Sequence, residues 1–203
     1  MNNGFFKYYK SGVLITLIAF LAITIFLAKD YWRISISIIS VISAFLIIID
    51  KCLWKTKLFS WMFWVENFSG RYEGELEYCY RDDNCIEQKG KLKHTKIIHQ
   101  TGSRISVYSF TIKDDLTPSS KSENKGMHVE KLNGGKHFEL TFNYLNDGNE
   151  SLATHYGTDV LKFIRNGDKK FLTGRYYTER LPFQTKGKYL NLVWKSNDSE
   201  HDF

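Results

Sequence analysis

The stretch His137-Phe138-Glu139-Leu140-Thr141-Phe142-Asn143-Tyr144 alternates polar and apolar side chains at every position. Successive side chains of a β-strand point to opposite faces of the sheet, so this period of two predicts a strand with one buried face. Residues 72–78 repeat the pattern, with Glu73, Glu75 and Glu77 together on one face. Similar β-rich stretches lie near residues 90–99, 103–113, 126–132, 153–165, 169–180 and 185–195.

Turn-forming residues separate these stretches. Asn-Gly and Asp-Gly pairs occur at 133–134, 147–148 and 166–167, and such pairs favour β-hairpins. Residues 68–197 are therefore predicted to form an all-β domain of about eight antiparallel strands. Such a meander protects its edges by closing into a barrel or by splitting into a sandwich, and we favour the closed up-and-down barrel. A barrel of this size is just wide enough for packed side chains or one small ligand.

Two apolar runs precede this domain. Residues 11–28 contain 18 residues without a charge, and the second run, 33–49, contains 16 after Arg33. A spanning helix needs roughly 17–25 mostly apolar residues. We therefore predict a transmembrane hairpin whose second helix relies on Trp32 and Arg33 reaching the headgroups. A cleavable signal peptide is the alternative for the first run, but a charged turn and another apolar run follow it at once.

Basic residues at the ends of the two runs predict their orientation. Five lysines flank the side that carries both termini, and two basic residues lie in the intervening loop: Lys7, Lys10, Lys51, Lys55 and Lys57 against Lys29 and Arg33. The positive-inside rule therefore places both termini and the β domain in the cytoplasm. Ser40 and Ala44 form a small-xxx-small pair, which permits close helix packing within the hairpin or between subunits of a homo-oligomer. Residues 51–67 are predicted as an aromatic juxtamembrane connector, and residues 198–203 as a tail.

Composition and motifs narrow the range of functions. The chain has a net charge of +6, and seven basic against three acidic residues up to Gly70 supply +4 of it. The β domain is thus nearly neutral, which argues against DNA or RNA as a partner. The three cysteines are predicted to be reduced thiols, a Cys79–Cys85 bridge being the less favoured alternative. No common catalytic or metal-binding signature occurs, so we expect neither an enzyme nor a bound metal or cofactor.

The strongest candidate site lies near the ends of the late strands. On strand parity Tyr176, Thr178 and Arg180 share one face. An inward arginine beside tyrosine and threonine could hold a phosphate by a bidentate fork and a base by stacking. We predict a ligand pocket from the following residues: Tyr72, His155, Thr158, Tyr176, Thr178, Arg180 and Thr185. For Tyr72 and Arg180 a structural alternative has equal weight, in which the ring packs under the arginine and closes one end of a barrel.

The chain also resembles a known family. Its two apolar runs, the opening Ser69-Gly70-Arg71-Tyr72-Glu73-Gly74, and Gly174-x-Tyr176 with Arg180, Thr185 and Gly187 are similar to the two-transmembrane, β-strand-rich effectors of bacterial CBASS antiphage defence. Tyr72 stands where such openings more often have tryptophan. The resemblance implies a minimal lipocalin-like barrel that binds a cyclic dinucleotide made by a partner nucleotidyltransferase.

The same resemblance implies a non-enzymatic membrane activity. Ligand binding would drive oligomerisation through the membrane helices, disrupt the bacterial inner membrane and cause abortive infection. Two other readings remain open from the residues themselves. A membrane-tethered carrier of a small apolar ligand predicts an aliphatic lumen, and a membrane adaptor predicts a filled barrel.

Overall fold

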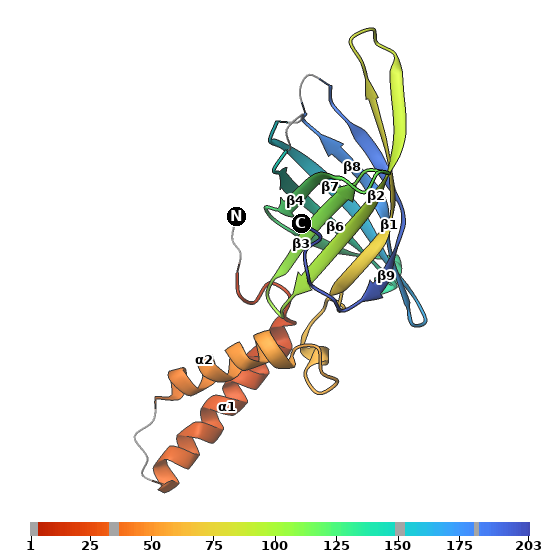
Figure 1. The fold of residues 1–203 in the computed structure, drawn as a ribbon. Coiled ribbons are helices and arrows are strands. Elements are labelled where there is room, and N and C mark those ends of the chain that lie inside the picture. The colour runs from red at the N-terminus through yellow and green to blue at the C-terminus, as the bar shows by residue number, and fades with distance from the viewer. Residues whose placement is uncertain (1–3, 33–36, 149–152, 181–182) are drawn as a thin grey trace. The chain divides into compact units, whose positions relative to one another are not determined.

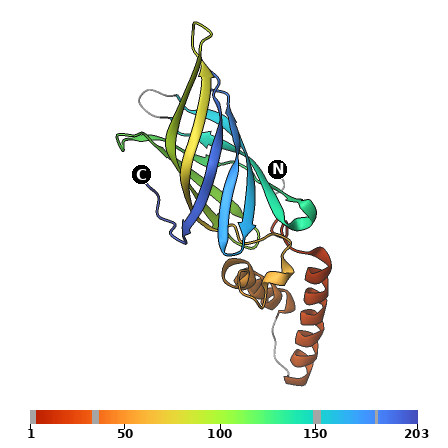
Figure 2. The ribbon, with the colours of Figure 1, turned by 90° about the vertical axis from the view of Figure 1, so that its right-hand side faces the viewer.

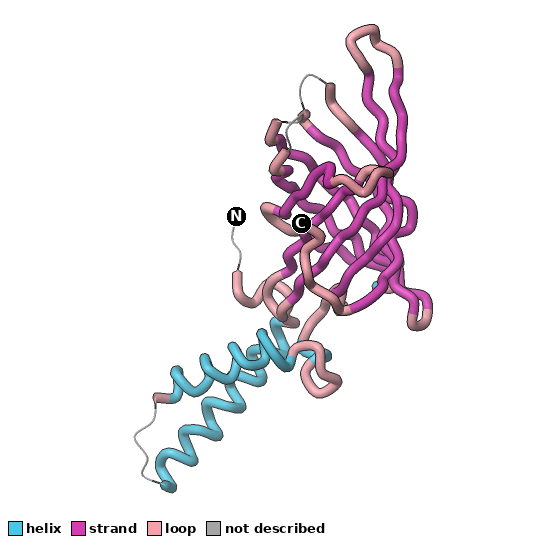
Figure 3. The backbone as a smooth tube through the Cα atoms, viewed as in Figure 1, coloured by secondary structure: helices cyan, strands magenta, loops and turns pink. Residues whose placement is uncertain are grey.

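The alternating stretches form nine strands of one antiparallel sheet (Figure 1). The computed structural model describes residues 4–32, 37–148, 153–180 and 183–203. The strands are β1 (Gly70–Arg81), β2 (Glu87–Gln100), β3 (Ile105–Ile112), β4 (Pro118–Asn124), β5 (His128–Leu132), β6 (His137–Asn146), β7 (His155–Asn166), β8 (Lys169–Thr178) and β9 (Lys186–Ser196). Apart from a 3-10 turn at 133–135, the described helices all lie before residue 68 (Figure 3).

The sheet closes into an antiparallel barrel with eight strand positions, one of which is shared by β4 and β5. Its order is β4-β3-β2-β1-β9-β8-β7-β6-β5, and β4 also pairs with β6. β4 and β5 pair with the same edge of β6, with Ser122 opposite Asn146 and His128 opposite Thr141. Together they act as one interrupted strand of the barrel. Figure 2 shows β1, β9 and β8 side by side where the first and last strands meet. The predicted closed barrel is confirmed, and the sandwich is wrong.

The interruption between β4 and β5 is bridged by a side chain. Asn124 Oδ1 accepts a hydrogen bond of 2.7 Å from the backbone N–H of Val107 on β3. The Asn124 amide nitrogen donates one of 3.1 Å to the carbonyl of Gly126. These bonds satisfy backbone groups that the broken ladder leaves without partners. The amide therefore holds the barrel closed where the strand is irregular.

One end of the barrel is filled by a packed aromatic core. The ring of Phe68 meets those of Phe138 and Phe163 edge-on, with centroids 5.3 and 4.8 Å apart. Tyr72 is fully buried beside them, and its hydroxyl donates to the Phe68 carbonyl at 2.8 Å. Leu140 and Leu161, also fully buried, face each other on β6 and β7. A barrel filled in this way leaves no room for a ligand at this end.

Residues 4–67, together with the loop 100–104, form a separate compact unit. Its helices are α1 (Ser11–Trp32), α2 (Ile38–Ile48), a π-helical turn (Ile49–Leu53) and a 3-10 turn (Ser60–Met62). Among the described residues, one helix, at Ser11–Lys29, is long and apolar enough to cross a membrane, and little of it is buried. Of the second predicted span, 33–49, the structure describes α2, which has 11 residues and runs directly into the π-helical turn, while residues 33–36 lie outside the described residues.

The small residues of α2 do not pack within the unit. Ser40 and Ala44 are both exposed, one helical turn apart. The sequence left open whether this pair packs within the hairpin or against another subunit. The described part of the hairpin does not cover it.

The connector after α2 is more buried than the sequence indicated. Trp54 and Phe63 are 5 % exposed each, and the Phe63 ring lies 4.4 Å from that of Tyr9. Asp50 is 3 % exposed and accepts a 3.1 Å hydrogen bond from the Ser103 hydroxyl. These buried side chains belong to the core of the N-terminal unit, whereas Trp61 of the same connector is 54 % exposed.

Candidate functional site

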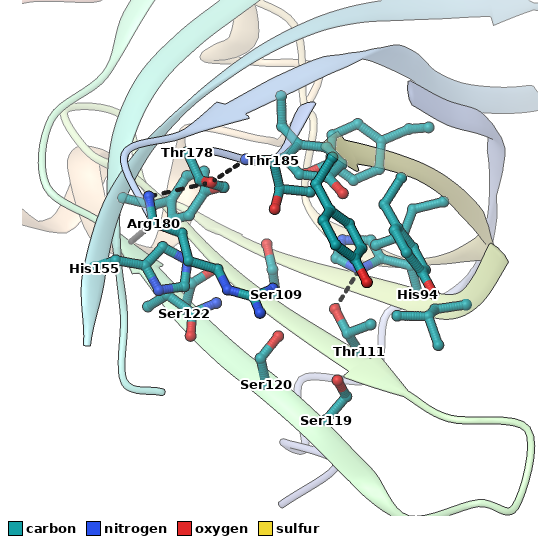
Figure 4. Close-up of a pocket in the computed structure, with 18 of the residues that line it drawn as sticks. His94, Ser109, Thr111, Ser119, Ser120, Ser122, His155, Thr178, Arg180 and Thr185 are labelled. Carbon is teal, nitrogen blue, oxygen red and sulfur yellow. Dashed lines mark hydrogen bonds between the residues drawn. The ribbon is translucent and has the colours of Figure 1, made fainter. Parts of the chain in front are cut away.

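A cavity of about 350 Å³ occupies the barrel lumen where β8 ends and β9 begins (Figure 4). Its described lining contains five tyrosines, seven serines and threonines, two histidines, two cations, one asparagine and two leucines. The lining residues are Leu76, Tyr78, Tyr80, Leu92, His94, Ser109, Thr111, Lys113, Ser119, Ser120, Ser122, Tyr144, Asn146, His155, Tyr176, Thr178, Arg180, Thr185 and Tyr189. All eight strand positions of the barrel contribute residues to this set. The cavity is thus a polar, aromatic chamber above the apolar core.

Glycines on neighbouring strands give the lumen tyrosines their positions. Tyr78 lies opposite Gly90, and Tyr144 lies opposite Gly157. A Cβ at Gly90 would stand 2.5 Å from Cζ of Tyr78, and one at Gly157 would overlap the Tyr144 phenol. The missing side chains let the rings lie flat against the barrel wall. With a larger residue at Gly90 or Gly157, the tyrosine ring would have to move into the lumen and fill part of the cavity.

A buried ionic network forms the inner boundary of the cavity. Lys96 Nζ lies 2.7 Å from Asp159 Oδ2, and the two side chains are 0 % and 1 % exposed. The ammonium also donates to Ser109 Oγ at 2.8 Å, and the Tyr189 hydroxyl donates to Asp159 Oδ1 at 2.7 Å. Burial lowers the pKa of Lys96, and the Asp159 carboxylate opposes that shift. Ser109 and Tyr189 belong to both the network and the cavity wall.

His94 stands beside this network on the same face of β2 as Lys96. Its Nδ1 lies 3.0 Å from Thr111 Oγ1, as Figure 4 shows, and its ring centroid lies 5.0 Å from that of Tyr189. The side chain is 5 % exposed, and among the described residues none hydrogen-bonds to Nε2. Burial and the nearby Lys96 ammonium hold the pKa of His94 well below the ordinary 6.5. The imidazole is therefore neutral at pH 7.

The outer part of the cavity carries positive charge. Arg180 follows the end of β8 and Lys113 follows the end of β3, and no carboxylate belongs to the described lining. Thr178 Oγ1 accepts hydrogen bonds from the backbone N–H groups of Arg180 and Thr185, at 3.4 and 3.1 Å. These two bonds fix the start and the end of the turn that carries Arg180. Its side chain extends into the cavity (Figure 4).

Five of the seven predicted pocket residues line this cavity: His155, Tyr176, Thr178, Arg180 and Thr185. The strand parity predicted for the late residues is confirmed, because their alternates Arg175 and Tyr177 are exposed on the outer surface.

The other two predicted residues lie elsewhere. Thr158 points outward, where its hydroxyl donates to Asn143 Oδ1 at 2.9 Å. Tyr72 belongs to the packed end and lies six residues before Tyr78 on β1, about 20 Å along the strand. Tyr72 therefore cannot pack under Arg180, which lies at the open end, and the structural alternative for that pair is wrong.

The sequence reasoning missed the inner part of the site, which comes from β2, β3 and β7. One usable signal was present: Lys96 shares its strand face with Ile98, and Asp159 shares its face with Leu161 and Phe163. A charge on an inward face indicates a buried partner, because an unpaired buried charge is very costly.

Comparisons with known proteins add no assignment. No protein-family model, curated protein or solved structure matches this chain significantly.

Proposed function

We propose that this protein is a membrane-anchored sensor whose barrel binds a cyclic dinucleotide and whose helices act on the membrane. The observation that supports this proposal most directly is the charge and chemistry of the cavity lining. Arg180 and Lys113 border it, hydroxyls and tyrosines line it, and the described lining holds no carboxylate. A ligand with phosphates and flat bases matches such a lining, because arginine forks bind phosphate oxygens and bases stack on aromatic rings.

The lining disfavours the apolar-ligand alternative. A fatty acid needs an aliphatic lumen, yet the apolar end of this barrel is filled by Phe68, Phe138 and their neighbours. The space that remains has two leucines among its described lining residues. Burying hydroxyls against a hydrocarbon chain leaves them without hydrogen bonds, which costs roughly 1–3 kcal/mol for each group.

Binding is tested on the full chain in detergent micelles by isothermal titration calorimetry. The probes are cyclic di-AMP, cyclic di-GMP, cyclic GMP-AMP and palmitate. We expect at least one cyclic dinucleotide to bind and palmitate not to bind. Binding of palmitate alone would favour the carrier, and binding of none of the four would favour an adaptor with no small ligand.

Arg180→Ala tests the cationic mouth. Removing a charge-assisted hydrogen bond is worth about 1.5–3 kcal/mol, so binding should weaken by about tenfold or more. Arg175→Ala is the matched control, because Arg175 lies on β8 as well but faces outward, where its guanidinium meets the Tyr177 hydroxyl. Equal affinity of the two variants for the bound dinucleotide would refute a role for Arg180.

The membrane step of the proposal rests on the N-terminal unit. The apolar side chains of α1 are largely exposed, including Phe20 and Phe26, and such a surface calls for lipid or another helix. The exposed Ser40 and Ala44 on α2 permit close approach of a second copy. Ligand can drive such assembly only if it binds the assembled state more tightly. We place the β domain and both termini on the cytoplasmic side of a bacterial inner membrane.

Dye-loaded vesicles test this step. Vesicles that carry the protein should release dye after the bound dinucleotide is added, and chemical cross-linking should show oligomers. Replacing Ser40 and Ala44 by isoleucine should reduce release and, because the ligand favours the assembled state, should weaken ligand binding without abolishing it. Ligand binding with neither oligomers nor release would separate a sensor from a membrane-disrupting effector. The expected consequence in cells is abortive infection.

A further inference from the structure

His94 carries a hydrogen-bonding atom that the fold leaves unused. Its ring is fixed on one side by Thr111, 3.0 Å from Nδ1, and on its face by Tyr189. Its Nε2 is buried, has no hydrogen-bond partner among the described residues, and belongs to a side chain that lines the cavity. A buried polar atom without a partner is disfavoured in a folded protein, so its persistence calls for an explanation. Because the His94 side chain lines the cavity, a ligand that reaches the inner end would lie against the imidazole.

The surroundings of His94 select an uncharged partner. The nearest cation, Lys96, is already paired with Asp159 and bonded to Ser109. The Lys96 ammonium is thus already neutralised, and the inner part of the described lining holds no other cation for an anion at Nε2. Arg180 and Lys113 lie instead at the outer part of the cavity, and neither forms an ion pair with any described residue. Phosphate therefore fits the mouth, and a neutral polar group fits the inner end.

A neutral imidazole can serve either kind of neutral partner. If Thr111 donates to Nδ1, then Nε2 carries the proton and donates; if Nδ1 donates to Thr111, then Nε2 accepts. The hydroxyl hydrogen can rotate to suit either tautomer. The edges of nucleobases present such amino, carbonyl and ring-nitrogen groups. Tyrosines held flat against the wall, among them Tyr144 opposite Gly157, offer faces for the rings of the same bases.

We infer that His94 reads the edge of a nucleobase that enters the cavity first, while the phosphates stay outside at Arg180 and Lys113. This orientation rests on the proposed function, because it assumes a ligand that contains both bases and phosphates. His94 then determines which base is accepted, and the two cations determine that the ligand is a phosphate ester. Specificity of this kind follows when a buried polar group is paired by one ligand and left unpaired by another.

The test compares selectivity in two variants of the full chain in detergent. Affinities for cyclic di-AMP, cyclic di-GMP, cyclic GMP-AMP and cyclic UMP-AMP are measured by titration calorimetry. His94→Phe keeps a ring against Tyr189 but removes Nε2, so the preferred dinucleotide should bind about tenfold more weakly and the preference should shrink. His94→Gln, which retains a donor and an acceptor, should restore part of the affinity. Arg180→Ala should weaken all four ligands to a similar extent and keep their order.

A stability measurement separates this role from a structural one. His94→Phe removes Nε2, which has no partner among the described residues, but also the 3.0 Å hydrogen bond between Nδ1 and Thr111, so the melting temperature without ligand should fall by about 2–4 °C or less. A larger fall together with unchanged selectivity would overturn the inference while the proposed function stands. Unchanged ligand order in both His94 variants would overturn it as well. If wild type binds none of the four dinucleotides, the proposed function and this inference both fail.

Discussion

Replacing Lys96 by methionine removes the ammonium from a buried ion pair and leaves Asp159 nearly without compensation. Both side chains are at most 1 % exposed, and among the described residues the carboxylate keeps the Tyr189 hydroxyl, 2.7 Å away, as a side-chain donor. Breaking such a pair from one side costs about 3–5 kcal/mol. One kcal/mol shifts the melting temperature of a chain of this size by roughly 2–4 °C. We therefore expect Lys96→Met to melt between about 6 and 20 °C lower.

The assay follows thermal unfolding of the full chain in detergent by circular dichroism in the β-sheet region. Lys91→Met is the matched control on the same strand, because Lys91 is 60 % exposed and pairs with Glu77 at 3.2 Å. An exposed pair contributes at most about 1 kcal/mol, so this control should lose little. Lys96→Met combined with Asp159→Leu should recover part of the loss, since no lone charge remains. A double variant that melts below Lys96→Met, or a single variant within about 2 °C of wild type, would refute the reasoning.

Three further predictions concern the site, its titration and the N-terminal unit. Gly90→Ala should push the Tyr78 ring into the cavity and weaken dinucleotide binding in calorimetry, with the melting temperature falling by only a few degrees or less. Because the pKa of His94 is lowered in the folded state, the unfolded chain takes up a proton that the folded chain excludes as pH falls below 6.5. Wild type should then lose up to about 1.4 kcal/mol per pH unit relative to His94→Phe between pH 6.5 and 5, measured by denaturant unfolding at several pH values; parallel curves would contradict this. Asp50→Ala removes the acceptor of the Ser103 hydroxyl and should make the loop 100–104 more accessible to protease, whereas Ser103→Ala alone should have a smaller effect.

Local pattern was sufficient for the strands and their faces. The alternation in residues 137–144 and the Asn-Gly and Asp-Gly turns predicted β6 and its hairpins, because the period of two and the turn chemistry are properties of neighbouring residues. The same parity placed Tyr176, Thr178 and Arg180 together inside the barrel and Arg175 outside.

The parts that failed depend on length along the chain and on contacts at a distance. Tyr72 and Arg180 both face inward, but parity does not say at which height in the barrel a residue lies, and the two belong to opposite ends. Within the apolar run 33–49, α2 covers Ile38–Ile48, and the sequence did not indicate the π-helical turn that begins at Ile49. Hydropathy records composition and does not register such a change in backbone pitch.

The amino-acid sequence by itself determined that this is a β-strand domain behind an apolar helical segment, with an arginine, tyrosine and threonine on one inward face. The tertiary structure decided which inward residues meet. Lys96 and Asp159 are 63 positions apart, and only closure of the barrel and the stagger of its strands bring them within 2.7 Å. The same stagger sets His94 beside Tyr189 in the cavity wall. Side-chain direction is local, but height and neighbours across a lumen are fixed by how the whole sheet closes.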